Sequence, residues 1–202
     1  NKTPSNWREK NNFKDNDILY FYGGIIGYAQ GLEIIINVAN KLKANSKLKF
    51  ILLGNGPERE KLINLSNKLS LNNVFFFDAV TKDKMPNILS SVDYSIVPLK
   101  KLDLFLGAIP SKIFECLAMK VPIILGVDGE ARELFIDKGK CGLYFEPENV
   151  EQLYEQIIKT IKDTELKTKL GNNARDYVFN NFNRENIATD FKQELDKLFE
   201  TN

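Results

Sequence analysis

Histidine is absent from this 202-residue sequence, and cysteine, methionine and tryptophan are scarce. Without histidine the chain cannot form a Ser-His-Asp triad, a Cys-His nucleophile pair or the commonest catalytic zinc sites. The two cysteines, Cys116 and Cys141, are too few for a disulfide framework, which fits a reducing compartment. Both stand among apolar residues, so we predict two small buried side chains. Any chemistry must therefore use carboxylates, lysine, arginine, hydroxyls, backbone dipoles or the substrate itself.

Long apolar runs and an excess of either charge are missing as well. No segment approaches the roughly 20 apolar residues that span a bilayer, and no signal peptide opens the chain. The 28 basic and 27 acidic residues leave a formal net charge of +1, so no global field attracts nucleic acid. We expect a cytoplasmic protein that binds no nucleic acid, and whose full-length form is also able to contact the inner surface of the membrane.

The composition indicates a single folded domain. Hydrophobic residues make up 43% of the chain, which suits one sizeable core but not two. Residues 1–16 are polar and rich in Asn and Lys, and an apolar strand then begins abruptly. We therefore predict a polar lead-in over 1–16 and one domain over 17–202, with a preceding N-terminal half absent from this chain.

Apolar runs and helical patterns alternate along the whole sequence. Strands are predicted at 18–22, 48–53, 74–77, 94–98, 121–125 and 142–145. Helices are predicted at 32–42, 57–69, 110–118, 130–138, 150–161, 164–180 and 184–200, with another after Thr81 that carries Met85 to Val92. Strands this apolar are buried on both faces, so we predict a doubly wound, Rossmann-like α/β fold with a parallel sheet of about six strands. Ligands of such sheets bind where strands end and helices begin.

Two glycine-rich loops follow the first and second predicted strands. The first runs from Gly23-Gly24 to Gln30-Gly31, and its spacing does not match the dinucleotide fingerprint. Its glycines either let the backbone approach an anion or simply form a tight turn. The second loop contains Gly54, Asn55 and Gly56, and we expect these residues to keep a ligand cleft open. Arg59, beside Glu58 and Glu60, is interpreted as a partner in a surface ion pair.

The strongest candidate site lies after the fourth strand, where Ile109, Pro110 and Ser111 open a helix. Lys112 places a positive charge in the first turn, which costs about 0.3–1 kcal/mol against the helix dipole unless an anion binds there. Glu115 follows three residues later and so lies on the same helix face. A carboxylate can accept hydrogen bonds from two adjacent sugar hydroxyls, although a simple pair with Lys112 is the alternative.

A fourth loop follows the fifth predicted strand and contains Asp128, Gly129 and Glu130. Two interpretations are equally compatible with its sequence. Asp128 or Glu130 caps the following helix, or the backbone amides of the loop face a donor sugar.

Together the four loops resemble the C-terminal domain of group 1 (family 4) glycosyltransferases of the GT-B fold, over about residues 17–199. The stretches that carry the resemblance are Gly-Asn-Gly-Pro-Glu-Arg at 54–59, Pro-Ser-Lys-Ile-Phe-Glu at 110–115 and Pro-Ile-Ile at 122–124. The resemblance implies a nucleoside diphosphate sugar as the substrate, with no metal or other cofactor and usually retention of the anomeric configuration. It also implies that the final helix packs against the absent acceptor domain.

The chain departs from the common family pattern at three positions. Gly24 stands where many relatives have arginine, Gln30 where they have lysine, and Gly107 where they have the first of two glutamates, the second matching Glu115. A subgroup with Ala-Gln-Gly-Leu-Glu and Pro-Ser-Lys looks more similar, and it includes bacterial transferases that build surface polysaccharides, often from amino-deoxy sugars. In that subgroup Lys112 would replace part of the phosphate-binding charge, and Gln30 would donate neutral hydrogen bonds.

These residues predict a division of roles in binding a donor, for which we expect UDP. Lys112 and the first-loop amides would hold the diphosphate, Glu115 the ribose, and the backbone at 78–80, including Val80, the base. The acceptor and any general base would belong to the absent half, so the chain alone should bind donor and turn over little. The alternatives are a sugar-nucleotide epimerase and a non-catalytic nucleotide-sugar-binding module.

Overall fold

A computed structural model describes residues 6–200 and contains a six-stranded, fully parallel sheet. The strands are β1 (Ile18–Gly23), β2 (Leu48–Leu53), β3 (Val74–Phe77), β4 (Tyr94–Pro98), β5 (Ile123–Gly126) and β6 (Gly142–Tyr144). Their spatial order is β3-β2-β1-β4-β5-β6, the doubly wound order in which successive strands are added outward in one direction from β1 and in the other from β4. The predicted fold class is confirmed.

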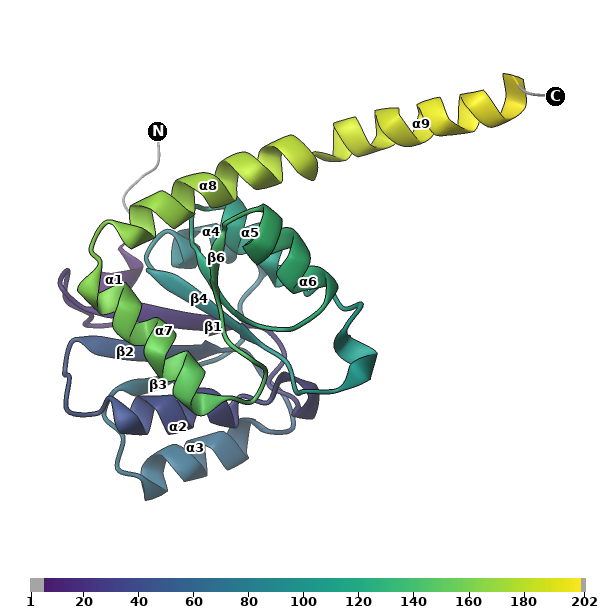
Figure 1. Ribbon diagram of the computed structural model, residues 1–202. Coiled ribbons are helices and arrows are strands. Elements are labelled where there is room, and N and C mark those ends of the chain that lie inside the picture. The colour runs from purple at the N-terminus through teal and green to yellow at the C-terminus, as the bar shows by residue number, and fades with distance from the viewer. Residues whose placement is uncertain (1–5, 201–202) are drawn as a thin grey trace.

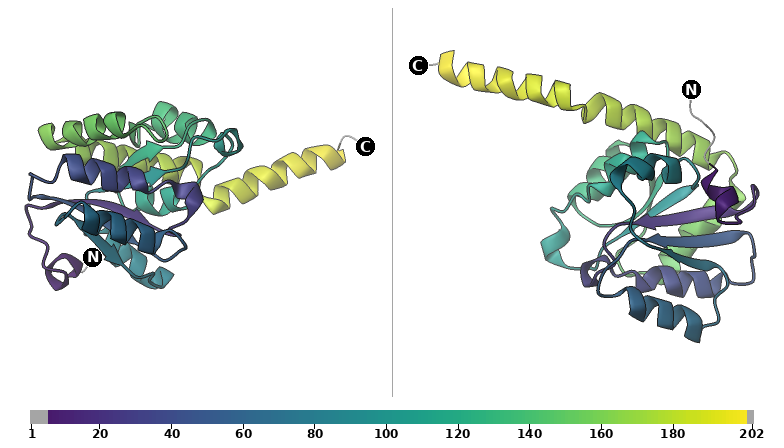
Figure 2. Two further views of the ribbon diagram at one scale, coloured as in Figure 1. Left: turned by 90° about the horizontal axis from the view of Figure 1, so that it is seen from below. Right: turned by 180° about the vertical axis from the view of Figure 1, so that it is seen from behind.

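Helices cover both faces of the sheet (Figures 1 and 2). Helices α2 (Glu33–Lys41), α3 (Arg59–Lys68) and α7 (Val150–Lys162) bury side chains with one face. Helices α4 (Met85–Leu89), α5 (Lys112–Ala118), α6 (Glu130–Arg132) and α8 (Leu166–Asn181) do so with the other. β1 shows why both faces are filled. Its alternating side chains are all apolar or aromatic, with Leu19 and Phe21 in one core cluster and Tyr20 and Tyr22 in the other.

Several element boundaries differ from prediction by a few residues. β5 begins at Ile123 rather than at 121, and β6 ends at Tyr144. Thr81 precedes a short 3₁₀ turn, η2 (Lys82–Lys84), its side chain makes no capping bond, and α4 follows only at Met85. Two further 3₁₀ turns, η1 (Tyr28–Gln30) and η3 (Asp103–Phe105), were not predicted. The helix expected at 130–138 begins as α6 and continues as a π-helical segment, η4 (Glu133–Lys138).

The described part of the N-terminal segment packs against the rest of the domain. Residues Trp7–Lys10 form α1, the Trp7 ring lies 5.3 Å from that of Phe77, and Phe13 is buried in the core. Arg8 pairs with the largely buried Asp93 at 2.6 Å, and Asp93 also accepts a hydrogen bond from the Leu19 amide. The described part of the predicted lead-in is therefore packed into the domain rather than preceding it.

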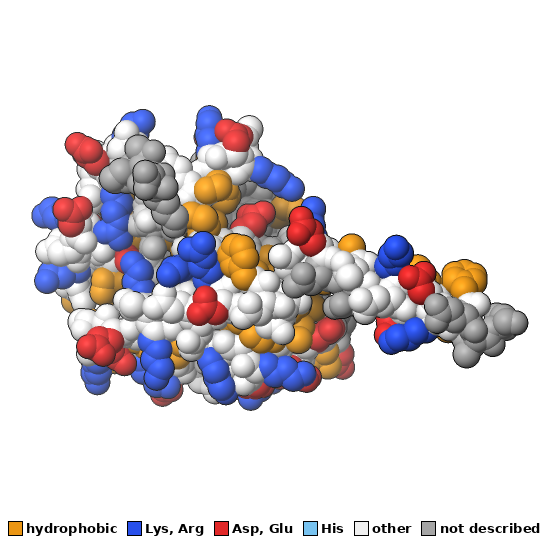
Figure 3. Space-filling view, turned by 90° about the horizontal axis from the view of Figure 1, so that it is seen from above, with side chains coloured by type: hydrophobic (Ala, Val, Ile, Leu, Met, Phe, Trp, Pro, Cys, Tyr) orange, Lys and Arg blue, Asp and Glu red, His pale blue; other side chains and the backbone are white. Residues whose placement is uncertain are grey.

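The last helix, α9 (Arg184–Glu200), projects away from the rest of the molecule (Figures 1 and 2). Five large apolar side chains on it are exposed, namely Ile187, Phe191, Leu195, Leu198 and Phe199. Within residues 6–200, no helix has the length and apolar character needed to cross a membrane. On the face seen in Figure 3, basic and acidic side chains are interspersed. As predicted, Cys116 and Cys141 are buried free thiols.

Candidate functional site

A cleft of about 520 Å³ opens at the carboxyl ends of β1 and β4. The strand order reverses between these two strands, and their loops therefore diverge to opposite faces of the sheet. Nine of the predicted site residues line this one cleft: Gly23, Gly24, Gln30, Val80, Ile109, Pro110, Ser111, Lys112 and Glu115. The structure thus brings together most of the candidate residues of three separate loops.

Lys112 is the most unusual charged group in the cleft. Its Nζ lies 3.9 Å from the centroid of the Tyr22 ring, and burial lowers the pKa of its ammonium to about 8. No carboxylate lies within ion-pair distance of it in the part of the chain that the structure describes. A desolvated cation without a counterion is suited to receiving an anionic ligand.

Glu115 lies on the outer rim of the same cleft, one helical turn after Lys112, and its side chain is exposed. The alternative role considered for it, an ion pair with Lys112, is not formed between these two described residues. Both oxygens of Glu115 therefore remain available as acceptors at the mouth of the cleft.

The first loop comes close to Lys112 through backbone alone. The amide of Gly24 donates to the Leu53 carbonyl at 2.9 Å, and its φ of 138° suits glycine. A Cβ on Gly24 would stand 2.8 Å from Lys112 Nζ, so the ammonium occupies the space that any larger residue would need. Gln30 accepts a hydrogen bond from the Gly27 amide at 3.1 Å through its side-chain oxygen.

The second loop supports the first loop more than it opens the cleft. Gly54 and Asn55 line an adjoining hollow of about 280 Å³ with Ala79 and Val80, which also borders Gly24. A Cβ on Gly54 would lie 1.8 Å from the Gly24 carbonyl oxygen, and one on Gly56 would lie 2.3 Å from that of Ile26. The expectation that these glycines keep the cleft open is therefore wrong for Gly56, which lines neither space and is needed for backbone packing.

Arg59 forms the surface ion pair that was predicted, but with a different partner. Its guanidinium lies 3.2 Å from Asp78 at the end of β3, rather than beside Glu58 or Glu60. The pair joins the second loop to the segment that follows β3, at one edge of the smaller hollow.

The fourth loop does not join the cleft. Asp128 borders a separate hollow, and its side chain accepts from the Gly129 amide at 2.9 Å and pairs with Arg132 at 3.2 Å. The Glu130 amide donates to the Leu106 carbonyl at 2.8 Å, so neither amide is free to face a donor sugar. Neither of the two interpretations of this loop holds, because no side chain caps α6 either.

Sequence reasoning missed several residues that line the cleft, among them Lys82, Met85, Leu99 and Phe105. Lys82 and Met85 follow β3, where the rule that ligands bind at strand ends could have found them. Phe105 belongs to a stretch whose sequence indicates only an irregular polar connection, and no local pattern points to it.

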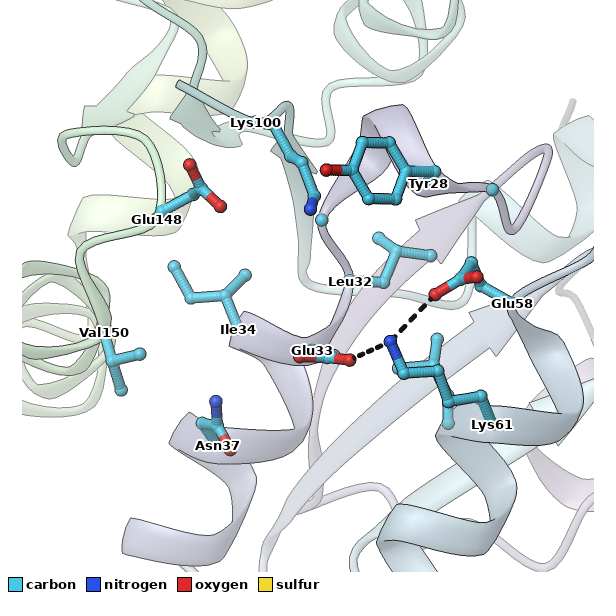
Figure 4. Close-up of a pocket in the computed structure, with 13 residues that line it drawn as sticks. Tyr28, Leu32, Glu33, Ile34, Asn37, Glu58, Lys61, Lys100, Glu148 and Val150 are labelled. Atoms are coloured by element: carbon cyan, nitrogen blue, oxygen red, sulfur yellow. Dashed lines mark hydrogen bonds and ion pairs between the residues drawn. The ribbon is translucent and has the colours of Figure 1, made fainter. Parts of the chain in front are cut away.

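A second hollow, of about 190 Å³, is bordered by Gly27, Tyr28 and Gly31 of the first loop (Figure 4). Three of its charged groups, Lys61, Glu33 and Glu58, pair with one another, whereas Lys100 contacts an aromatic ring. Lys61 lies 2.5 Å from Glu33 and 3.1 Å from Glu58, and Lys100 Nζ lies 3.5 Å from the centroid of the Tyr28 ring. Within residues 6–200, no group of three or more Cys, Asp or Glu side chains is placed to hold a metal ion.

Comparisons with known proteins agree on one family. A family model described as glycosyl transferases group 1 matches residues 4–177. The chain is 28% identical over 193 residues to the putative colanic acid biosynthesis glycosyl transferase WcaI of Escherichia coli K12, covering 93% of this chain and 45% of that protein. The chain thus spans about half the length of the curated relatives it matches.

Solved structures share the fold. The chain superposes on Anabaena HepE, determined with UDP and glucose, with a TM-score of 0.82, 20% identity and coverage of 97% of this chain and 53% of that one. It superposes on the C-terminal domain of a group 1 family protein, LpcC of Francisella tularensis, with a TM-score of 0.74 and 17% identity. That alignment covers 91% of this chain and 95% of the LpcC domain.

Proposed function

The chain belongs to the group 1 glycosyl transferases, and on that premise we propose that it is the donor-binding domain of a sugar-transferring enzyme. The proposed donor is a nucleoside diphosphate sugar, with UDP as the nucleotide. The acceptor is a surface polysaccharide or a lipid-linked precursor, and transfer retains the anomeric configuration. The single observation that carries the proposal is the partly buried ammonium of Lys112, which has no carboxylate partner among the described residues and lies beside Gly24 in the wall of a cleft of about 520 Å³.

The chemistry of the donor explains why such a cation is useful. When the bond between sugar and diphosphate breaks, negative charge develops on the departing diphosphate. Lys112 stabilises that charge without a metal, and it does so more effectively because its own side chain is largely removed from water. The two amides at the start of α5, those of Ser111 and Lys112, lack an acceptor in the described chain and supply further donors to the same oxygens.

The other parts of the donor follow from the shape of the site. Glu115, unpaired at the rim, accepts hydrogen bonds from the ribose hydroxyls. The hollow beside Ala79 and Val80 takes the base, which packs against the backbone after β3. The fourth loop has no part in this arrangement, because the amides of Gly129 and Glu130 are already bonded within the chain and Asp128 borders a separate hollow.

The remaining half of the reaction is assigned to a second domain. The acceptor site and any general base lie there, so this chain alone binds donor but turns over little. The exposed apolar side chains of α9 are the surface that this second domain covers. The full-length enzyme works in the cytoplasm, at or near the membrane.

Calorimetry on the 202-residue chain tests the proposal. UDP and uridine are titrated into the wild type and into Lys112→Ala, with ADP and GDP as alternatives for the base. Loss of a charge-assisted contact should weaken UDP binding by roughly 10–100-fold and leave uridine binding unchanged. Equal losses for the two ligands would mean that Lys112 does not bind the phosphates.

A non-catalytic binding module is the second candidate, favoured because the first loop contributes no charged side chain to the cleft. Hydrolysis of a nucleotide sugar by the full-length protein would reject the module. Analysis of the products would separate sugar transfer from epimerisation.

A further inference from the structure

Tyr22 lies beneath the donor cleft without lining it, and it contacts both Lys112, which we assign to the diphosphate, and the first loop that borders the cleft. Its side chain is 1% exposed at the end of β1. The ring face lies under Lys112 Nζ at 3.9 Å, and its hydroxyl donates to the Ile25 carbonyl in the first loop at 2.5 Å. Burial raises the pKa of this phenol, so the hydroxyl stays protonated and remains a donor.

We propose that Tyr22 is a positioning residue of the donor site, whose ring holds the Lys112 ammonium and whose hydroxyl holds the first loop. This inference rests on the proposed function, in which that ammonium binds the diphosphate. It adds a residue that would never touch the ligand.

The ammonium has a narrow space to occupy. It is bounded by the Tyr22 ring on one side and by Gly24 on the other, where a Cβ would lie 2.8 Å from Nζ. The face of a tyrosine ring attracts a cation, and the attraction grows as water is excluded. A lysine side chain has four rotatable bonds, so fixing its end before the ligand arrives removes an ordering cost from binding. Only one side of the ammonium faces the ring, which leaves N–H donors for phosphate.

The glycine at position 24 now has a specific explanation. An arginine at this position would fill the space that Lys112 occupies in this chain. The cation therefore comes from α5 rather than from the first loop, and an aromatic ring beneath it replaces the carboxylate that usually holds a lysine. Tyr22, Gly24 and Lys112 form one unit in which each residue depends on the other two.

Two substitutions separate the ring from the hydroxyl. Tyr22→Phe keeps the ring and loses the bond to Ile25, whereas Tyr22→Leu loses both. Tyr20→Leu is the matched control, since Tyr20 is an equally buried tyrosine on the same face of β1 that does not contact Lys112. Circular dichroism confirms folding before each variant is used.

The first measurement needs no ligand. In chain labelled with ¹³C-lysine, the ε-CH₂ protons of Lys112, assigned by their loss in Lys112→Ala, should be shifted upfield by the ring current of Tyr22. The shift should persist in Tyr22→Phe and in Tyr20→Leu and vanish in Tyr22→Leu. A wild-type Lys112 resonance at the ordinary position for an exposed lysine would overturn the proposal by itself.

The second measurement is the ratio of the UDP and uridine affinities by calorimetry. We expect this ratio to be roughly 5–30-fold lower in Tyr22→Leu than in Tyr22→Phe, and unchanged in Tyr20→Leu. Equal ratios in the two Tyr22 variants, or tighter UDP binding by Tyr22→Leu, would overturn the positioning role. If Lys112→Ala keeps the wild-type ratio, the proposed function fails instead, so the two failures are distinguishable.

Discussion

The pH dependence of UDP binding is the most direct test of the charge on Lys112. Burial lowers the pKa of this ammonium to about 8 in the free chain. A bound diphosphate favours the charged form and returns the pKa toward its ordinary value near 10.4. Binding therefore requires a protonated Lys112, and UDP affinity should be close to its maximum near pH 7 and fall as the pH rises through 8.

The size of the effect follows from the same pKa. At pH 9, one unit above it, about a tenth of the free chain carries the charge, so UDP affinity should be roughly tenfold lower than at pH 7. Ionisation of UDP itself contributes little to this change in affinity, because its second phosphate ionisation, near pH 6, is complete above pH 7. The buried thiols do not interfere either, since burial raises the pKa of Cys116 to about 11 and that of Cys141 to about 12.

Calorimetry at pH 7, 8 and 9 in two buffers of different ionisation enthalpy measures both affinity and proton uptake. Close to one proton should be taken up per UDP bound at pH 9, and very little at pH 7. The Lys112→Arg variant keeps its positive charge from pH 7 to 9, so its UDP affinity should not change with pH. Uridine, titrated under the same conditions, shows whether ionisation of the base alters binding. A flat profile in the wild type, or an equal decline in Lys112→Arg, would refute the reasoning.

Three other predictions can be checked with the same preparations. In calorimetry, the wild type should prefer UDP over its 2′,3′-dideoxy analogue by about 1–3 kcal/mol, and Glu115→Gln should lose most of this preference. If the mutant keeps the preference, another residue binds the ribose. Gly54→Ala should lower the free energy of unfolding in urea by about 2–4 kcal/mol, because the new Cβ would lie 1.8 Å from the Gly24 carbonyl at a φ of +143°. Gly107→Ala, with open space around it, is the control and should change that free energy by less than about 0.5 kcal/mol. Excess EDTA should leave UDP affinity unaltered, whereas a requirement for Mg²⁺ or Mn²⁺ would contradict a metal-independent site.

Local patterns in the sequence were sufficient for the sheet and for most of the cleft. Continuously apolar strands indicate a sheet that is buried on both faces, and glycine-rich loops before helices indicate the carboxyl ends of parallel strands. Lys112 could be singled out because a cation in a first helical turn is locally unfavourable. Each of these inferences depends only on residues close together in the chain.

The predictions that failed depended on distant partners. Arg8 lies in a polar stretch, and its role appears only when Asp93, 85 residues away, is brought beside it. The sequence of the loop at 128–130 is compatible with amides that face a ligand, but the Glu130 amide donates a hydrogen bond to the Leu106 carbonyl instead. Nothing in the local sequence specifies either contact, because both are set by how the sheet and its helices pack.

The packing of the first two loops also changes how substitution patterns in related proteins should be interpreted. Gly54 lies against the backbone of Gly24, and Gly56 lies against that of Ile26. Both contacts are so close that a Cβ at either glycine would overlap a backbone carbonyl. Selection for folding alone would keep glycine at 54 and 56, even in a descendant that had stopped using nucleotides. Invariance at these two positions is therefore uninformative about activity, and a search for active relatives should weigh positions 22, 112 and 115 instead.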